Sequence, residues 1–227
     1  MTRYALYYLP PPSAPWAKFC AAWLGWDVIK GQPLPPPALP DLPAPVADIT
    51  ETPRKYGLHA TLKPPFHLLQ GQTEAALIAA CAQLAQTLAP VALDGLAVTR
   101  LGRFLALCPT GDTQQLSALA AACVQSVDRF RAPPAPAELA KRRASRLSPA
   151  QEANLLRWGY PYVMDQFRFH LTLTGKRPAA QAAALSALLD HHLAGQLPSP
   201  FVISDIALVA ERADGRFCLR QRFALSG

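Results

Sequence analysis

Apolar and polar residues alternate in two short segments of the chain, and the two segments resemble each other. Residues 56–63 read YGLHATLK, and residues 168–174 read RFHLTLT. Alternate side chains of a β-strand point to the same side. The pattern therefore predicts two strands, each with a histidine and a hydroxyl residue on one face and apolar residues on the other. The expected polar faces carry His59, Thr61 and Lys63 in the first strand, and Arg168, His170, Thr172 and Thr174 in the second.

The elements that follow each of these strands also correspond. A helical pattern covers residues 73–88 after the first strand and 179–194 after the second, and His59 and His170 are 111 positions apart. Two further strand patterns follow each helix, at residues 91–99 and 103–108 and at residues 201–210 and 216–224. The strand–helix–strand–strand unit thus occurs twice. Its period of about 110 residues is too long for a solenoid, so the pattern predicts an internal duplication.

Three other segments have readable patterns. Residues 1–9 resemble a strand, and residues 32–54 form a proline-rich stretch that predicts a long, semi-rigid surface loop. Residues 137–158 predict two helices, the second beginning with a capping box at Ser148. The first of these helices includes the basic cluster KRRASR at residues 141–146, which either caps a substrate or forms a solvated helix face.

Composition narrows the class of partner. The chain has 227 residues, a net charge of +7 and 24 prolines. A basic surface favours an anionic partner such as a phosphate ester or a nucleic acid. No apolar run is long enough to cross a membrane, and residues 10–12, all proline, end the apolar start too early for a signal peptide. The five cysteines include no C-x-x-C pair, so we expect buried free thiols and a cytoplasmic location.

The paired histidines predict acid–base chemistry on a phosphodiester. Imidazole titrates near neutrality, so His59 and His170 can act as one base and one acid, with side-chain nitrogens roughly 5–8 Å apart across a cleft. Thr61 and Thr172 would donate hydrogen bonds to phosphate oxygens. Lys63 would neutralise developing charge. A structural role is the ordinary alternative for any single histidine in a strand.

Other residues on or near this face are candidates for substrate contacts. Arg168 can neutralise phosphate charge, Thr174 shares the face of His170, and Tyr7 belongs to an aromatic-rich segment that either stacks on a base or packs in the core. The chain lacks the H-E-x-x-H, H-x-H-x-D-H, G-x-x-x-x-G-K-[ST] and G-x-G-x-x-G motifs. No metal or cofactor is therefore expected, and chelators should leave activity unchanged.

Two H-x-[ST]-x motifs about 110 residues apart resemble those of the 2H phosphoesterase superfamily. The resemblance implies an α+β bilobal fold, in which two antiparallel sheets line a cleft and each lobe contributes one motif. It also implies catalytic roles for His59 and His170, phosphate binding by Thr61 and Thr172, and no metal. We expect one bilobal domain over residues 1–227. Its expected parts are lobe one at about 30–130, lobe two at about 1–29 and 160–227, and a helical basic insert at 137–158.

Four longer segments are similar to a bacterial branch of that superfamily associated with phosphonate metabolism and carbon–phosphorus lyase genes. They are RYALY with PPP near the N-terminus, YGLHATLKPPF, WGYPY and FRFHLTLTG. This resemblance implies a metal-independent cyclic phosphodiesterase acting on a small sugar cyclic phosphate, such as a phosphoribosyl 1,2-cyclic phosphate. The alternatives are an RNA 2′,3′-cyclic phosphodiesterase or ligase, and a non-catalytic RNA-binding module. The sequence leaves open the oligomeric state and which histidine is the acid.

Overall fold

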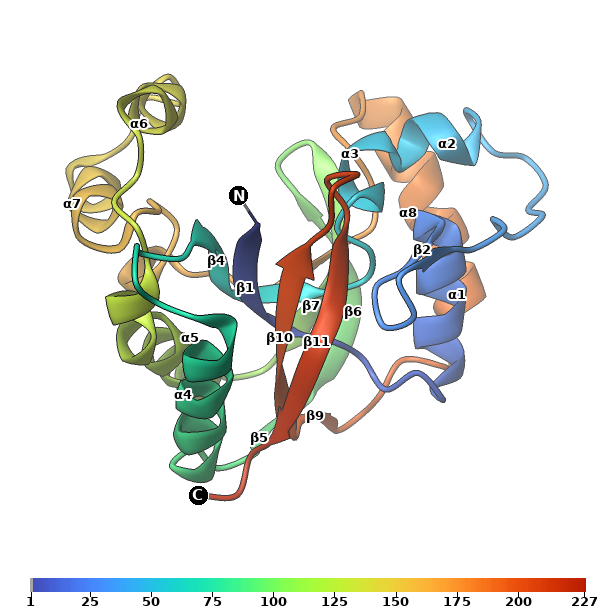
Figure 1. Cartoon of the computed structure of the whole chain (residues 1–227). Helices are drawn as coiled ribbons and strands as arrows, with labels where there is room; N and C mark the ends of the chain where they lie inside the picture. Colours follow the sequence, from blue (N-terminus) through green and yellow to red (C-terminus); the bar gives the residue numbers. More distant parts are fainter. Residues whose placement is uncertain (1) are drawn as a thin grey trace.

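A seven-stranded sheet forms the centre of the computed structural model, which describes residues 2–227 (Figure 1). Its strand order is β11-β10-β1-β4-β8-β7-β6. The strands are β1 (Arg3–Tyr8), β4 (Ala60–His67), β6 (Gly95–Leu101), β7 (Phe104–Thr110), β8 (Leu171–Thr172), β10 (Asp205–Glu211) and β11 (Phe217–Ala224). Two small ladders pair β2 (Trp26–Asp27) with β3 (Gln32–Pro33) and β5 (Val91–Leu93) with β9 (Phe201–Ile203). Neighbouring strands are antiparallel throughout, as expected for the α+β class.

The larger helices share one apolar core with the sheet. They are α1 (Pro15–Leu24), α4 (Glu74–Gln86), α5 (Gln114–Ser126) and α8 (Ala179–Leu193). Helix α5 packs against β4, α4 against β10 and β11, and α8 against β6 and β7. Helix α1 is joined to the sheet by the indole of Trp23, which donates a hydrogen bond to the carbonyl of Leu173 at 2.8 Å.

Four short helices and two 3₁₀ turns complete the chain. They are α2 (Val46–Ile49), α3 (Glu51–Arg54), η1 (Asp128–Phe130), α6 (Pro136–Arg143), α7 (Pro149–Trp158) and η2 (Met164–Gln166). The predicted proline-rich loop therefore contains α2 and α3. Helices α6 and α7 stand apart from the sheet at the upper left of Figure 1 and form the predicted insert. The capping box is confirmed, because Ser148 and Gln151 exchange side-chain and backbone hydrogen bonds.

The predicted duplication is confirmed by the order and the pairing of the elements. β4, α4, β5, β6 and β7 are followed in the second copy by β8, α8, β9, β10 and β11. Equivalent strands pair with each other, since Ala60 lies opposite Leu171 and Ala92 lies opposite Val202. Antiparallel pairing of equivalent strands is the arrangement that an approximate two-fold axis between the copies requires.

The predicted lobe boundaries do not match the two ends of the sheet. The β6–β7 hairpin of the first copy adjoins β8 of the second copy. The β10–β11 hairpin of the second copy joins β4 of the first through β1. Lobes cut at residues 30–130 and 160–227 would separate these paired strands, because each copy gives its hairpin to the other. The two expected antiparallel sheets correspond to the halves β11-β10-β1-β4 and β8-β7-β6, which a single residue pair between β4 and β8 joins into one sheet.

Candidate active site

His59 and His170 lie at the narrow middle of the sheet. Each immediately precedes a residue of the Ala60–Leu171 pair, the one pair that joins β4 to β8 within residues 2–227. In an antiparallel pair, the residue before one partner lies opposite the residue after the other. The Ala60–Leu171 pair therefore sets His59 beside Thr172 and Thr61 beside His170. All four of these side chains line the same cleft. The two motifs are therefore side by side at its floor, while the distance between the imidazole nitrogens stays a prediction.

The imidazole of His59 is held in a half-buried position. Its Nδ1 contacts the carbonyl oxygen of Gly57 at 3.0 Å, and its Nε2 contacts Oγ1 of Thr61 at 3.2 Å. Its ring stacks on Tyr7 with the centroids 4.0 Å apart. Gly57 has a φ of +68°, and a Cβ there would lie 3.0 Å from the ring of Trp26. Only glycine therefore fits the turn that directs this carbonyl at the imidazole.

Burial makes His59 hard to protonate. Burial, together with a smaller effect of the nearby His170, lowers the pKa of His59 to about 4 against the opposing effect of the Gly57 carbonyl. His59 is therefore neutral at physiological pH. Because a carbonyl oxygen can only accept, Nδ1 carries the proton and Nε2 is left with its lone pair toward Thr61.

His170 repeats the same arrangement. Its Nδ1 contacts the carbonyl oxygen of Arg168, two residues before it, at 2.8 Å. The same argument assigns the Nδ1 proton to this bond, so Nε2 is again the nitrogen that can exchange a proton. The ring of Phe104 from β7 lies 5.8 Å away between centroids. The two histidines thus use the same ring atom from the two copies of the repeat.

The cleft around the histidines has a volume of about 830 Å³. Besides the two motifs, it is lined by four arginines and by aromatic, apolar and amide side chains. They are Arg3, Tyr7, Tyr56, Leu62, Pro64, Pro65, Arg100, Leu101, Gly102, Phe104, Arg142, Gln151, Tyr160, Tyr162, Val163, Gln166, Phe167 and Arg168. The proline-rich loop at 32–54 contributes nothing to this lining, whereas the insert contributes Arg142 and Gln151. The insert therefore takes part in the cleft.

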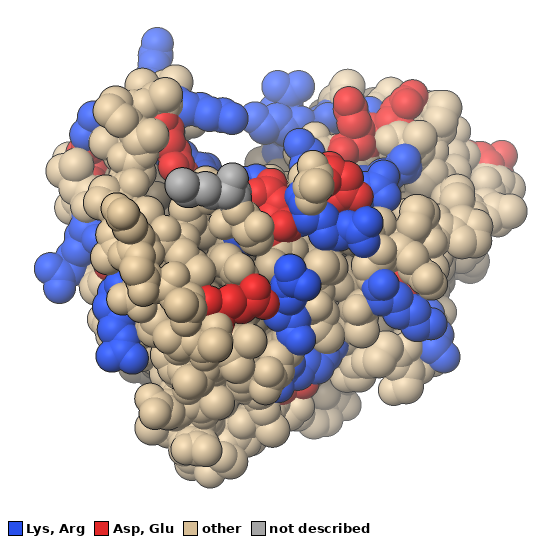
Figure 2. All heavy atoms as spheres, in the orientation of Figure 1, with Lys and Arg blue, Asp and Glu red and all other residues tan. Residues whose placement is uncertain are grey.

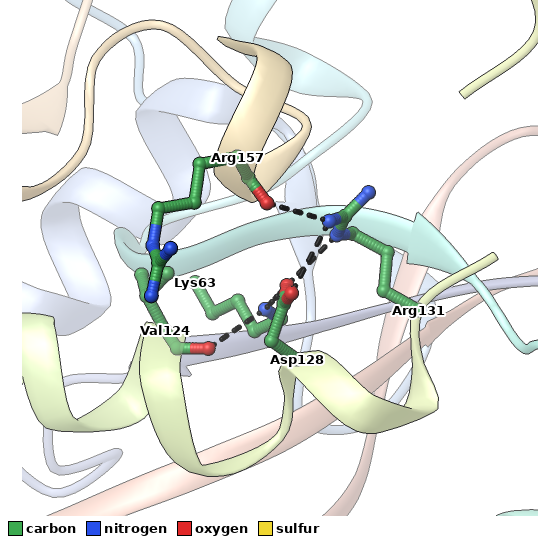
Figure 3. Close-up of polar contacts among 5 residues, drawn as sticks. All are labelled: Lys63, Val124, Asp128, Arg131 and Arg157. Atoms are coloured by element: carbon green, nitrogen blue, oxygen red, sulfur yellow. Dashed lines mark hydrogen bonds and ion pairs between the residues drawn. The ribbon is translucent and has the colours of Figure 1, made fainter. Parts of the chain in front are cut away.

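Lys63 does not face the cleft, which corrects the prediction from strand alternation that it would lie beside His59 and Thr61. Its side chain is 2% exposed, and its ammonium donates to the carbonyl of Val124 at 3.0 Å and to Asp128 at 3.2 Å (Figure 3). Tyr7 pairs with Thr61 but Leu6 pairs with Lys63, so Leu62 is an extra residue. Such a β-bulge reverses the alternation and turns Lys63 toward α5.

The bulged lysine is part of a larger polar network. Asp128 also accepts hydrogen bonds from Arg131, which in turn donates to the carbonyl of Arg157 at the end of α7 (Figure 3). Burial lowers the pKa of Lys63 to about 8, against the opposing effect of Asp128. The two prolines that follow Lys63 are the sequence signal for this irregularity, because proline in a central strand is confined to bulges.

Thr174 is also turned away from the cleft. It is buried, and its hydroxyl accepts a hydrogen bond from the backbone N–H of Leu105 at 3.0 Å. The predicted second strand is only two residues long, because Leu173 and Thr174 both donate to the Leu105 carbonyl and the alternation ends there. Tyr7 and Arg168 do line the cleft, Tyr7 as the buried support beneath His59 and Arg168 as an exposed side chain.

Several lining residues were not identified individually from the sequence. Arg3, Tyr160 and Tyr162 lie in segments that carry the resemblance to the phosphonate-associated branch, and Arg142 lies in the basic cluster. Nothing local in the sequence distinguishes Arg100 from other exposed arginines. These residues meet at the cleft because β1, β6 and the insert converge there.

Comparison with known proteins identifies the family. Residues 61–218 match the model of a family described as a protein of unknown function, DUF1045. The chain belongs to this family. The match includes Thr61, His170 and Thr172 and begins two residues after His59.

Two curated relatives cover the histidine motifs and extend beyond them. The ribose 1,5-bisphosphate phosphokinase PhnN of Janthinobacterium sp. (strain Marseille) is 36% identical over 233 residues, which cover 100% of this chain and 51% of that protein. The protein of the same name from Laribacter hongkongensis (strain HLHK9) is 37% identical, with 94% of this chain and 49% of that protein covered. The chain thus spans about half the length of these relatives.

Solved structures are similar over the whole chain but remote. TT0787 of Thermus thermophilus has a TM-score of 0.45 and 18% identity, covering 99% of this chain and 98% of that chain. LigT of E. coli complexed with NADP+ has a TM-score of 0.45 and 16% identity, covering 100% and 98%. These likenesses carry no argument, and the resemblance of this chain to the 2H phosphoesterases rests on its paired H-x-T motifs.

Two further expectations can be compared with the described residues. The five cysteines are free thiols, of which Cys20, Cys81 and Cys123 are buried and Cys108 and Cys218 are partly buried. Among residues 2–227, no helix combines the length and the apolar character that a membrane crossing needs.

Proposed function

We propose that this protein is a cyclic phosphodiesterase that uses His59 and His170 as a base and an acid. The observation that carries the proposal is the antiparallel register that sets the two H-x-T motifs side by side at the floor of the cleft. One imidazole Nε2 can take a proton from the attacking oxygen and the other can give one to the leaving oxygen. The two threonine hydroxyls beside them can donate hydrogen bonds to the phosphate.

The proposed reaction is a hydrolysis. The oxygen of a water molecule attacks phosphorus while its proton passes to Nε2 of the base. The bond from phosphorus to one ring oxygen breaks, and Nε2 of the acid protonates that oxygen. The products are a phosphate monoester and a free hydroxyl group. The Thr172 hydroxyl donates a hydrogen bond to one non-bridging oxygen. The Thr61 hydroxyl, 3.2 Å from Nε2 of His59 in the free protein, turns to donate to the other. The arginines of the cleft stabilise the charge on phosphorus.

We assign the base to His59 and the acid to His170. The low pKa of His59 keeps its imidazole neutral, which is the form that accepts a proton from water. Its stacking on Tyr7 and its bond to the Gly57 carbonyl keep the ring in one orientation. His170 then supplies the proton to the leaving oxygen.

We propose a ribose cyclic phosphate as the substrate. This chain matches about half of each curated relative, and both relatives are named ribose 1,5-bisphosphate phosphokinase. Opening a 1,2-cyclic phosphate of ribose 5-phosphate at the bond to O2 would yield ribose 1,5-bisphosphate. The two halves of such a relative would then act in succession, and this chain would supply the phosphokinase substrate.

The first test is hydrolysis of a panel of cyclic phosphates by the wild type and three variants. We expect His59→Ala and His170→Ala each to lower turnover by ~10²–10⁴, the usual contribution of one general acid or base. The double variant should lose far less than the product of the two single losses, because the pair acts as a unit. His67→Ala serves as a matched control, since His67 lies at the far end of β4 and does not line the cleft.

Two outcomes would reject the proposal. Folded His59→Ala and His170→Ala variants that retain wild-type rates would exclude the twin-histidine mechanism and favour a binding module. Activity that is lost with a chelator and restored by a divalent cation would indicate a metal site instead. The panel includes an oligoribonucleotide with a 2′,3′-cyclic phosphate end, which would be the preferred substrate if the RNA alternative were correct.

A further inference from the structure

The charge of the cleft exceeds what one cyclic phosphate can neutralise. Four arginines line it, and no aspartate or glutamate does so among residues 2–227. Arg3 is already neutralised, because its Nε and Nη2 both bind the carboxylate of Glu211. Within residues 2–227, Arg100 and Arg168 form no ion pair with a carboxylate, and Arg142 has only a long ion pair with Glu138. A cyclic phosphodiester carries a single negative charge, so a surplus of positive charge remains.

Arg142 has the most clearly unfulfilled bonding capacity of these arginines. Its Nε is buried and has no hydrogen-bond partner among residues 2–227. Its nearest carboxylate is that of Glu138, with Nη2 and Oε1 3.8 Å apart, which is beyond hydrogen-bonding distance. Its guanidinium lies 4.6 Å from the centroid of the Tyr160 ring. A guanidinium fixed on an aromatic ring is pre-organised for bidentate binding of a phosphate.

The other cations of the basic cluster do not have this arrangement. Arg143 is bound to Glu152, with Nε and Oε1 2.9 Å apart. Lys141 and Arg146 are exposed, and neither lines the cleft. Figure 2 shows Lys and Arg side chains near the hollow between the insert at the upper left and the rest of the molecule. Only Arg142 of the four cluster cations belongs to the lining of the cleft.

The aromatic support of Arg142 is fixed to the catalytic strand. Tyr160 follows the last residues of α7, where the carbonyl of Arg157 accepts a hydrogen bond from Arg131 at 3.0 Å (Figure 3). Arg131 is tied through Asp128 to Lys63 on β4. This chain of bonds connects the Tyr160 segment under Arg142 to β4, the strand that carries Thr61. It therefore constrains the distance between Tyr160 and Thr61.

We propose that Arg142, stacked on Tyr160, binds a second phosphate of the substrate, a monoester that does not react. This inference rests on the proposed function and specifies its substrate class as a cyclic phosphodiester with a further phosphate group. A monoester adds a charge of about −1.5 to −2 near neutral pH, which complements the surplus of arginines. The insert is then the part of the chain that selects the substrate.

The test compares ribose 1,2-cyclic phosphate with and without a 5-phosphate. The measured quantity is the ratio of the two kcat/KM values in the wild type, in Arg142→Gln and in Lys141→Gln. We expect the wild type to prefer the phosphorylated substrate, and the preference to fall about 10- to 100-fold in Arg142→Gln, as for a lost charge-assisted hydrogen bond. Lys141→Gln removes the same charge from the neighbouring position, and should keep the wild-type ratio.

Direct binding separates this inference from the proposed function. Ribose 1,5-bisphosphate and ribose 1-phosphate are titrated calorimetrically into the same three proteins, which requires no hydrolysis. Selective weakening of bisphosphate binding in Arg142→Gln supports the subsite even if no cyclic phosphate is hydrolysed. Hydrolysis with an unchanged ratio and unchanged binding in Arg142→Gln overturns the subsite and leaves the proposed function standing. The subsite is also overturned if the wild type prefers the oligoribonucleotide with a 2′,3′-cyclic phosphate end over both ribose 1,2-cyclic phosphates.

Discussion

At the scale of single residues, the two histidines differ although their motifs are alike. Both direct Nδ1 at the carbonyl two residues earlier, at Gly57 and at Arg168. His59 is also packed on Tyr7, and burial lowers its pKa to about 4. An approximate symmetry of the backbone therefore places the two imidazoles in different surroundings.

The low pKa of His59 predicts the acidic side of the pH–rate profile. The neutral base is the minor form only below about pH 4, so kcat/KM should rise with pH through about 4, well below the ordinary histidine value of about 6.5. The measurement uses a cyclic phosphodiester without a second phosphate, so that no substrate group titrates in this range. A rising limb centred near pH 6.5 would contradict the assignment of His59 as a buried base.

At the scale of secondary-structure elements, the bulge in β4 decides which side chains reach the cleft. It presents Thr61 and Leu62 to the cleft and sends Lys63 into the network with Asp128 and Arg131. That network also holds the end of α7 through the Arg157 carbonyl. The position of the insert is thus linked to the geometry of β4.

This link predicts that a substitution at Gly159 lowers the free energy of unfolding more than the same substitution at another glycine that ends a helix. Gly159 follows α7 with a φ of +75°, and a Cβ there would lie 2.8 Å from Nη1 of Arg131. The other guanidinium nitrogens of Arg131 are already bonded. Gly159→Ala should therefore break part of the network as well as strain the backbone. Gly195 follows α8 with a φ of +68° and open space around it, so Gly195→Ala costs only the strain, about 1–2 kcal/mol.

The difference between the two variants measures the contact with Arg131. Urea denaturation should give a free energy of unfolding at least ~1.5 kcal/mol lower for Gly159→Ala than for Gly195→Ala, the lower end of the range for one lost hydrogen bond to a charged group. Equal losses of unfolding free energy in the two variants would mean that Arg131 can move aside for the new Cβ without a cost in stability.

At the scale of the whole molecule, the two copies of the repeat are interlocked. The β6–β7 hairpin pairs with β8, and the β10–β11 hairpin reaches β4 through β1. The equivalent strands β5 and β9 also pair with each other. Neither copy can complete its part of the sheet alone, and the proposed catalytic pair of histidines exists only where both copies meet.

A chain cut between the copies should consequently remain one particle. A specific protease site introduced after Arg146, an exposed residue between α6 and α7, would give two fragments. We expect them to elute together in gel filtration under native conditions and to separate only in denaturant. Separate elution of folded fragments would contradict the exchange of hairpins.

The sequence by itself determined the features that depend on local pattern. Strand alternation and the matching order of the helical and strand patterns predicted the repeat, and the segments after each histidine follow the expected order. The facing of Thr61 and Thr172 was predictable because each lies two positions after its histidine. The capping box at Ser148 is equally local, since its hydrogen bonds join residues three apart.

Only the tertiary structure decided where alternation ends and which distant residues meet. Lys63 and Thr174 satisfy the local pattern, yet a bulge and a shared carbonyl turn them into the interior. The lobes, the low pKa of His59 and the place of Arg142 depend on contacts between residues far apart in the chain. Such contacts are set by packing across the whole sheet, and no short segment contains the information to specify them.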